Sequence, residues 1–288
     1  MILSISIIGD MMIGFPIYIH CWGGFGSQLN AYFFYQFLNK ISRRPLKLIF
    51  HSSGVTRRPI EIDFLLKGKV SYQFVDDFTA TIRPSIKKKQ NIHRRMLSFM
   101  ARLFRILISP QSIDDLHPLF PWTISVRGTY SHCRYSRETL DIFLQALSKY
   151  SNTYAEPQGV VHYRLGDLVE IDKEFVSGVK ITQLINSVYE SNWLLISDSS
   201  SLATKQLINI STQKVLSISD ANSSIDILNF CIKAKVFIGT NSKLSIWASV
   251  LRASVLGLPS FMPLNLKDTI IDLVDIQAFN KILFYDAS

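Results

Sequence analysis

Residues 159–168 read Gly-Val-Val-His-Tyr-Arg-Leu-Gly-Asp-Leu, a pattern that predicts a short buried strand ending in a turn. The strand begins just after the break at Pro157. His162, Arg164 and Asp167 then gather at its carboxyl end, where open α/β sheets bind ligands. Because a guanidinium is always charged and pairs two oxygens at once, Arg164 suits a diphosphate. The alternative is a structural ion pair between Arg164 and Asp167.

The second half of the chain alternates strand and helix patterns, which predicts a parallel, doubly wound sheet. The expected elements there are 159–163, 181–191, 193–196, 202–208, 215–217, 224–233, 236–238 and 245–256. The first half shows strand patterns at 15–22, 46–50 and 70–75 and helix patterns at 28–39 and 137–150. The polar stretch around Pro157 is the expected boundary. It gives two domains, 1–156 and 157–288, which a chain of 288 residues accommodates.

A glycine-rich turn follows the first expected strand and contains Gly23, Gly24 and Gly26, with Gln28 opening the next helix. A strand, a glycine turn and a helix in succession offer backbone N–H groups to an anion. The spacing is not that of the dinucleotide fingerprint, so the alternative is a tight turn packed against the sheet.

A third stretch, residues 237–248, reads Phe-Ile-Gly-Thr-Asn-Ser-Lys-Leu-Ser-Ile-Trp-Ala. Together with residues 23–29 and 162–167, it resembles the bacterial α-1,2-fucosyltransferases of glycosyltransferase family 11. Those enzymes carry Gly-Gly-Leu-Gly-Asn-Gln, His-x-Arg-Arg-Gly-Asp-Tyr and Ser-Asn-Ser-Ser-Phe-Ser-Trp-Trp motifs in this order. The resemblance spans roughly residues 17–255, and it departs from the family at Ser27 and at Leu165, which stands where the second Arg would be.

The resemblance implies a GT-B type fold, in which two Rossmann-like domains face a cleft. It also implies an inverting transfer of fucose or another 6-deoxyhexose from a GDP-sugar to a glycan, such as a lipid-linked oligosaccharide of O-antigen or capsule synthesis. The N-terminal domain would hold the acceptor and the C-terminal domain the nucleotide sugar. The candidate catalytic residues are Arg164, His162 and Asp167. The candidate donor-binding residues are Gly23, Gly24, Gly26, Gln28, Asp198, Asp226, Asn241, Ser242 and Ser245.

No metal site or cofactor is expected. The adjacent acidic pairs Asp76-Asp77 and Asp114-Asp115 point apart in an extended chain, and the six histidines show no ligand spacing. A departing diphosphate then needs Arg164 and a helix N-terminus to stabilise its charge. Asp226 has a second interpretation as a first-turn acid beside a capping serine.

The net charge of +9 is concentrated, since residues 83–105 hold eight Lys or Arg and no acid. We expect an inserted basic segment at about 83–108, with a helix over 94–108 that could lie on an anionic membrane surface. A buried helix with a thin solvated edge is the alternative. The segment also permits a different class of function, a non-catalytic peripheral membrane protein that binds phosphate. Nucleic acid is not expected as a partner, because aromatic residues do not interleave with these charges.

The three cysteines, Cys21, Cys133 and Cys231, form neither a disulfide framework nor a zinc pattern, which fits a reducing cytoplasm. Residues 1–8 are apolar without a basic flank, so no signal peptide is expected. The expected location is the cytoplasmic face of the inner membrane.

Overall fold

The computed structural model describes residues 15–53, 57–67, 70–78, 92–109, 122–131, 135–150, 158–165, 175–218 and 223–287. The chain divides into two compact units, Met1–Cys133 and Arg134–Ser288. Each unit is built on one sheet, and every strand pairing described in both sheets is parallel. The expected pair of parallel α/β domains is therefore confirmed.

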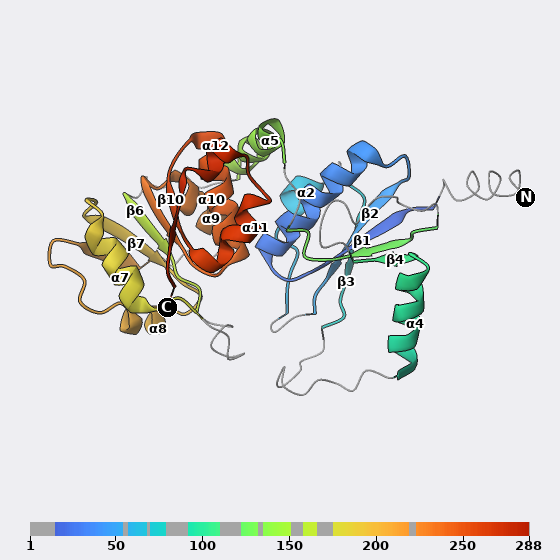
Figure 1. The fold of residues 1–288 in the computed structure, drawn as a ribbon, viewed down its shortest axis with the longest axis horizontal. Helices are drawn as coiled ribbons and strands as arrows, with labels where there is room; N and C mark the ends of the chain where they lie inside the picture. Colours follow the sequence, from blue (N-terminus) through green and yellow to red (C-terminus); the bar gives the residue numbers. More distant parts are fainter. Residues whose placement is uncertain are drawn as a thin grey trace, which may run out of the picture. The chain divides into compact units, whose positions relative to one another are not determined.

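Unit 1 has a five-stranded sheet in the order β3-β2-β1-β5-β4. The strands are β1 (Ile17–Trp22), β2 (Leu46–His51), β3 (Tyr72–Val75), β4 (Leu107–Ile108) and β5 (Ser125–Arg127). Ile17, Ile19 and Cys21 alternate along β1 as its buried side. Helix α2 (Phe25–Ile41) contacts β1 and β2 and runs beside them in Figure 1, and α3 (Asp63–Leu66) adds one turn after β2.

Helix α4 (Ile92–Leu103) corrects part of the expected 94–108 helix. The helix ends at Leu103, and Arg105 follows with a φ of 53°, in the left-handed region that a continuing helix cannot use. Leu107 and Ile108 form strand β4 instead, paired in parallel with β5. The last two residues of the expected basic helix therefore belong to the sheet of unit 1.

Unit 2 has a six-stranded sheet in the order β11-β10-β9-β6-β7-β8. The strands are β6 (Gly159–His162), β7 (Asn192–Ile196), β8 (Val215–Ile218), β9 (Val236–Gly239), β10 (Ser260–Pro263) and β11 (Ile282–Tyr285). The helices are α5 (Arg137–Ser148), α7 (Gly178–Ser187), α8 (Ser200–Gln206), α9 (Ser224–Lys233), α10 (Lys243–Leu251), α11 (Lys267–Ile271) and α12 (Ile276–Phe279). A π-helical turn (Arg252–Leu256) continues α10, and a 3₁₀ turn (Leu264–Leu266) follows β10.

The strand order of unit 2 is that of a Rossmann sheet. From β6 the chain moves outward through β7 to β8, and it then returns to the other side of β6 as β9. The strand order therefore reverses between β6 and β9. In open α/β sheets, the crevice outside the carboxyl ends of two such strands is where ligands bind.

Helix α5 belongs to unit 2, so the boundary between the units falls before this helix rather than at 156/157 as expected. It contacts α9 and the π-helical turn, and the Tyr135 ring lies 5.9 Å from the Trp247 ring of α10. The polar stretch around Pro157 lies outside the described residues, between α5 and β6, which belong to the same unit.

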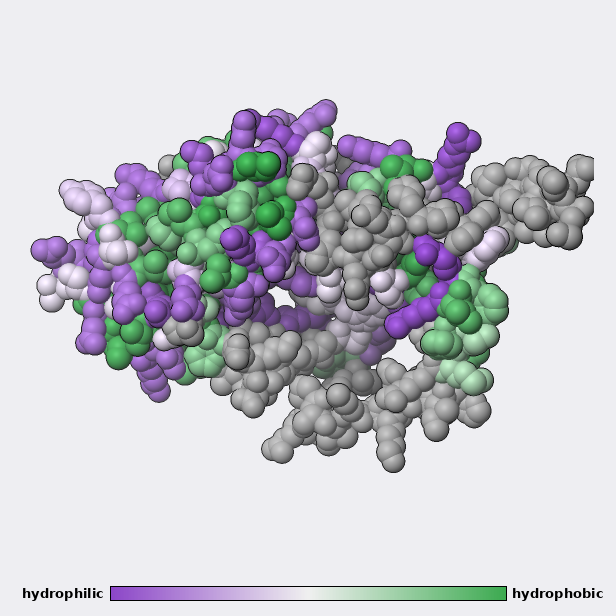
Figure 2. All heavy atoms as spheres, in the orientation of Figure 1, coloured by the Kyte–Doolittle hydropathy of each residue, from purple (hydrophilic) through white to green (hydrophobic). Residues whose placement is uncertain are grey.

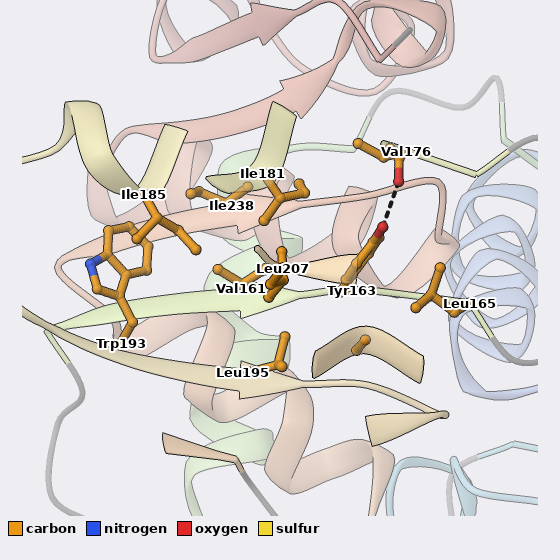
Figure 3. Close-up of a cluster of buried hydrophobic side chains, with 11 residues drawn as sticks. Val161, Tyr163, Leu165, Val176, Ile181, Ile185, Trp193, Leu195, Leu207 and Ile238 are labelled. Carbon is orange, nitrogen blue, oxygen red and sulfur yellow. Dashed lines mark hydrogen bonds between the residues drawn. The ribbon is translucent and has the colours of Figure 1, made fainter. Parts of the chain in front are cut away.

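The core of unit 2 fixes which way the side chains of β6 point. Val161, Tyr163 and Leu165 enter a buried apolar cluster together with side chains of α7 and β7 (Figure 3). The Tyr163 hydroxyl donates to the carbonyl of Val176 at 2.7 Å, so this ring is buried without losing its hydrogen bond. Because side chains alternate along an extended chain, His162 and Arg164 are left for the opposite face.

Candidate active site

His162 lies at the carboxyl end of β6, in contact with the first turn of α10. Its Nδ1 is 2.8 Å from the Ser245 hydroxyl, and its side chain is buried. Burial first, and the nearby Arg164 charge second, lower the pKa of His162 from 6.5 to about 4. The imidazole is therefore neutral at neutral pH. A neutral, buried imidazole bonded to a helix serine can position the strand end.

Thr240, which follows β9, joins the two strands on either side of the point where the strand order reverses. Its buried hydroxyl donates to the carbonyl of His162 at 2.9 Å and accepts from the Arg164 amide at 3.0 Å. The same residue's amide donates to Ser245 Oγ at 3.3 Å. The backbone amide of Arg164 is thus fixed by the Thr240 side chain.

Asp198 follows β7 and supports the same loop from the other side. Its Oδ1 accepts from the Leu165 amide at 2.9 Å, and its Oδ2 lies 4.0 Å from Arg164 Nε. The Arg164 side chain remains 31% exposed, so solvent and ligands can reach it. The structure therefore brings together three predicted site residues, His162, Arg164 and Asp198, at the carboxyl ends of β6 and β7.

Asn241, Ser242 and Ser245 complete this group from the β9 side. The Ser242 hydroxyl caps α10 by accepting from the Leu244 amide at 3.2 Å, and Asn241 Oδ1 is buried without a hydrogen-bond partner among the described residues. Gly239 makes the close approach possible, since a Cβ there would lie 2.9 Å from the Ser245 Cβ and 2.5 Å from the Met262 sulfur. We call His162, Arg164, Asp198, Thr240, Asn241, Ser242 and Ser245 the switch-point cluster.

Asp226, a further predicted residue, does not join the switch-point cluster. The Asp226 carboxylate accepts from the Ser223 hydroxyl at 2.6 Å, and the Ser223 hydroxyl accepts from the Asp226 amide at 3.1 Å. This reciprocal cap of α9 is the structural alternative expected for Asp226. Asp167 lies outside the described residues, so its catalytic role stays a prediction.

The predicted glycine turn belongs to unit 1 and forms a separate group. Gly23 has a φ of +111°, which favours glycine, and its turn leads directly into α2. The first amide of α2, at Phe25, donates at 2.8 Å to the carboxylate of Glu61. Because this carboxylate occupies the helix N-terminus, a diphosphate would have to displace it. Donor binding by Gly23, Gly24 and Gly26 therefore stays a prediction.

Gln28 is buried beneath this turn with its whole amide engaged. Its Nε2 donates to the carbonyls of Gly23 and Pro59, and its Oε1 accepts from the amides of Glu61 and Ile62. An amide offers two donors and two acceptor positions, and all four are used. This gives Gln28 a positioning role that ties the glycine turn to the 57–62 loop, in place of the predicted contact with the donor.

Sequence reasoning missed a polar group at the carboxyl ends of β1, β2 and β3 in unit 1. Asp77 Oδ2 lies 2.8 Å from His51 Nδ1, and His51 Nε2 lies 2.9 Å from His20 Nδ1. The Trp22 ring stacks on His51 with a centroid distance of 4.3 Å, and the Arg127 guanidinium lies 5.8 Å from the Trp22 ring. The spacing of these residues along the chain gave no signal, because four different strands, β5 with Arg127 included, bring them together.

Two kinds of special site are absent from the described ranges. No group of three or more His, Cys, Asp or Glu side chains there is arranged to hold a metal ion. No helix in the same part of the chain is long and apolar enough to cross a membrane.

Comparison with known proteins gives structural neighbours but no family. No family model matches the sequence, and no curated protein matches it. POFUT1 in complex with GDP is similar over 87% of this chain and 99% of its own, with 12% identity and a TM-score of 0.44. Fucosyltransferase NodZ from Bradyrhizobium covers 82% and 93%, with 12% identity and a TM-score of 0.40. The glycosyltransferase SnogD from Streptomyces nogalater covers 96% and 87%, with 11% identity and a TM-score of 0.38. With TM-scores below 0.5, these likenesses decide neither fold nor function, which have to be argued from the chain's own residues.

Proposed function

We propose that this chain is a GT-B type glycosyltransferase that transfers a sugar from a nucleoside diphosphate donor to a hydroxyl group of a glycan. By the motif resemblance, the donor is a GDP-6-deoxyhexose such as GDP-fucose, and the transfer is inverting and metal-independent. The observation that carries the proposal is the placement of Arg164. It is an accessible guanidinium, fixed through its backbone, at the point where a Rossmann sheet binds its ligand.

The chemistry follows from the charge that develops during transfer. As the bond between the anomeric carbon and the diphosphate oxygen breaks, the electron pair leaves with the diphosphate. A fixed guanidinium and the N-terminus of a helix both stabilise that growing negative charge. Arg164 supplies the first, and the first turn of α10, which Ser242 caps, supplies the second.

The carboxylate of Asp198 would repel a diphosphate placed directly beside it, so the diphosphate has to lie away from Asp198. Its contact with Arg164 is at Nε, the guanidinium nitrogen nearest to the backbone, and its other oxygen holds the Leu165 amide. We therefore give Asp198 the role of orienting Arg164. The buried oxygen of Asn241 offers an acceptor for a hydroxyl or amino group of the donor.

The proposal is tested by thermal unfolding with GDP-, UDP-, dTDP- and CMP-sugars, each with and without EDTA. A ligand at 100 times its Kd stabilises the native state by about 2.7 kcal/mol, so specific binding is measurable. GDP-sugars are expected to raise the Tm most, equally in EDTA, and the shift is expected to shrink in Arg164→Ala. No stabilisation by any nucleotide sugar would contradict the proposal.

The acceptor is proposed to be a lipid-linked oligosaccharide at the cytoplasmic face of a membrane, with α4 docking on the lipid surface. Phe99 and Phe104 are 64% and 56% exposed, which removes the alternative of a helix buried in the core. Apolar side chains cover the α4 region in Figure 2, and Arg102 is exposed among them. An amphipathic helix with cationic and large apolar side chains binds anionic interfaces.

The same α4 surface also supports a second candidate function, that of a peripheral membrane protein that binds phosphate without catalysis. Turnover separates the two. The transferase releases GDP from a GDP-sugar continuously, whereas the binding protein releases none beyond the amount bound.

A further inference from the structure

The hydrogen-bond chain Asp77–His51–His20 has a defined direction. Asp77 is a carboxylate and can only accept, so His51 Nδ1 must carry the proton and donate to it. In the His51 tautomer that carries only this proton, Nε2 is unprotonated and accepts from the His20 Nδ1–H at 2.9 Å. His20 Nε2 is consequently the unprotonated nitrogen. It has no hydrogen-bond partner among the described residues.

His20 itself is neutral at neutral pH. Burial, then the Arg127 charge and then His51, lower the pKa of His20 from 6.5 to about 4. Burial alone would raise the pKa of Asp77, but the hydrogen bonds from His51 and Ser53 outweigh it and the pKa falls below its ordinary value. Asp77 is therefore ionised while His20 is neutral. The Nε2 lone pair of His20 is available to accept a proton above about pH 4.

The position of the Asp77–His51–His20 hydrogen-bond chain in unit 1 fits a substrate site. His20 and Arg127 are register partners on β1 and β5, the two strands between which the strand order of unit 1 reverses. Both side chains lie on the side of the sheet opposite to the buried Ile19 and Val126. Trp22 is 38% exposed beside them, which gives an aromatic surface for the apolar face of a sugar ring.

We propose that His20 is the proton acceptor for the hydroxyl group of the glycan acceptor, and that His51 and Asp77 position it. This inference rests on the proposed function. As the hydroxyl oxygen bonds to the anomeric carbon, its proton passes to His20 Nε2, and the electron pair of the breaking bond leaves with the diphosphate. The products are the glycoside, the nucleoside diphosphate and protonated His20. The imidazolium is stabilised through His51 by the solvent-exposed carboxylate of Asp77, which takes the place of the triad carboxylate beside a catalytic histidine, and it then loses its proton to water.

The first test needs no substrate. Nitrogen chemical shifts of the histidine rings of the whole protein, followed from pH 7.5 to pH 4, report which ring nitrogen carries the proton. His20 is expected as the Nδ1–H form with a pKa well below 6.5, and Asp77→Asn should disturb it. An Nε2–H form of His20 would overturn the proposal even if the protein proves to be a transferase.

The second test measures the turnover of GDP-fucose with lactose, or with water, as the acceptor. His20→Gln is expected to lower kcat by roughly 10²- to 10⁴-fold, the range for a lost general base, while the Tm shift with GDP-fucose stays. In His20→Gln, the fall in rate on the acidic side of the pH–rate profile should also disappear. Asp77→Asn should lower kcat with little change in KM.

The matched control is Asp76→Asn, at the neighbour of Asp77 in the sequence. Asp76 bonds to Ser52 and Arg57 and lies outside the His20 chain, so normal turnover is expected. If His20→Gln folds, binds GDP-fucose and turns over normally, the proposal is wrong and the proposed function survives. If the wild-type protein binds no GDP-sugar, the proposed function fails instead, and the ring-nitrogen measurement still decides the state of His20.

Discussion

Arg164 is held in place by its backbone, since its own amide donates to Thr240 and the next amide donates to Asp198. Replacing the side chain should leave these bonds intact. Arg164→Ala is therefore expected to fold and to lower kcat by roughly 10²-fold or more, the scale for one lost electrostatic donor. Arg164→Lys should also be poor, because an ammonium cannot pair two oxygens in one plane.

The measurement for Arg164 is single-turnover sugar transfer, with circular dichroism to show that each variant is folded. A folded Arg164→Ala protein with near-normal kcat would make the end of β6 structural rather than functional. The proposed role of the switch-point cluster would then fail.

His162 makes a prediction about stability and pH. Its pKa is about 4 in the native state and 6.5 ordinarily, so below pH 6.5 the unfolded chain binds a proton that the native state does not. The stabilisation by the neutral ring is complete above pH 6.5 and is lost as the pH falls toward 4, by roughly 2 to 3 kcal/mol. Urea unfolding of the purified protein across this range should show the loss, and His162→Gln should reduce it, while the contribution of His20 remains. An equal slope in both proteins would contradict the assignment.

Single residues show where sequence reasoning succeeds and where it stops. The strand expected at 159–163 is present as β6, so His162 and Arg164 stand at its carboxyl end as the sequence indicated. Leu165 departs from the family motif for a physical reason, since it is fully buried in the apolar cluster of Figure 3, where a second arginine could not be solvated. Thr240 and His20 could not be found in this way, because their partners lie 78 and 31 residues away in the chain.

Among the elements, α9 depends on an arginine that no sequence pattern marked. Arg252 is fully buried, and its guanidinium donates to the carbonyls of Cys231 and Ile232 at the C-terminal end of α9 and to that of Pro259 before β10. Burial lowers its pKa to about 10, so it remains charged at neutral pH. Carbonyls at a helix end need such partners when water is excluded.

Arg252→Met is consequently expected to lower the free energy of unfolding by more than about 3 kcal/mol, because several buried carbonyls lose their donor at once. Urea unfolding of the purified protein measures this. Lys205→Met, on the exposed surface of α8, is the matched control and should change the stability by less than about 0.5 kcal/mol. A loss as small as the control's would mean that water or other donors replace the guanidinium.

Helix α4 carries the prediction of membrane binding. Each Lys or Arg near an anionic surface contributes on the order of 1 kcal/mol, and the exposed Phe99 and Phe104 add apolar contact. The protein is expected to float with vesicles containing phosphatidylserine at low salt and to bind less at high salt. Phe99→Ser with Phe104→Ser should abolish flotation, and Ile142→Ser, an exposed apolar position on α5, should not. No binding of the wild-type protein to anionic vesicles would refute the proposed docking.

At the scale of the whole molecule, the alternating strand and helix patterns were sufficient to predict the parallel sheet of unit 2, whereas the sheet of unit 1 was expected from the motif resemblance. They were not sufficient for the strand order or the boundary between the units. Strands β10 and β11 at one edge of unit 2 were missed, because their short segments lack a distinguishing pattern. The order places β6 beside β9, and this neighbourhood creates the switch-point cluster from three distant motifs.

The division into two units leads to a prediction about where a nucleotide acts. If GDP binds outside the carboxyl ends of β6 and β9, it should slow hydrogen exchange first in residues 159–165 and 239–247 of unit 2. The exchange of β1 and β2 in unit 1 should change much less, because the proposed acceptor site there is filled only by a glycan. Hydrogen exchange with mass spectrometry, at about 100 times the Kd of GDP, resolves these peptides. Protection confined to the glycine turn after β1 would instead place the diphosphate on unit 1, where it would have to displace Glu61 from the N-terminus of α2.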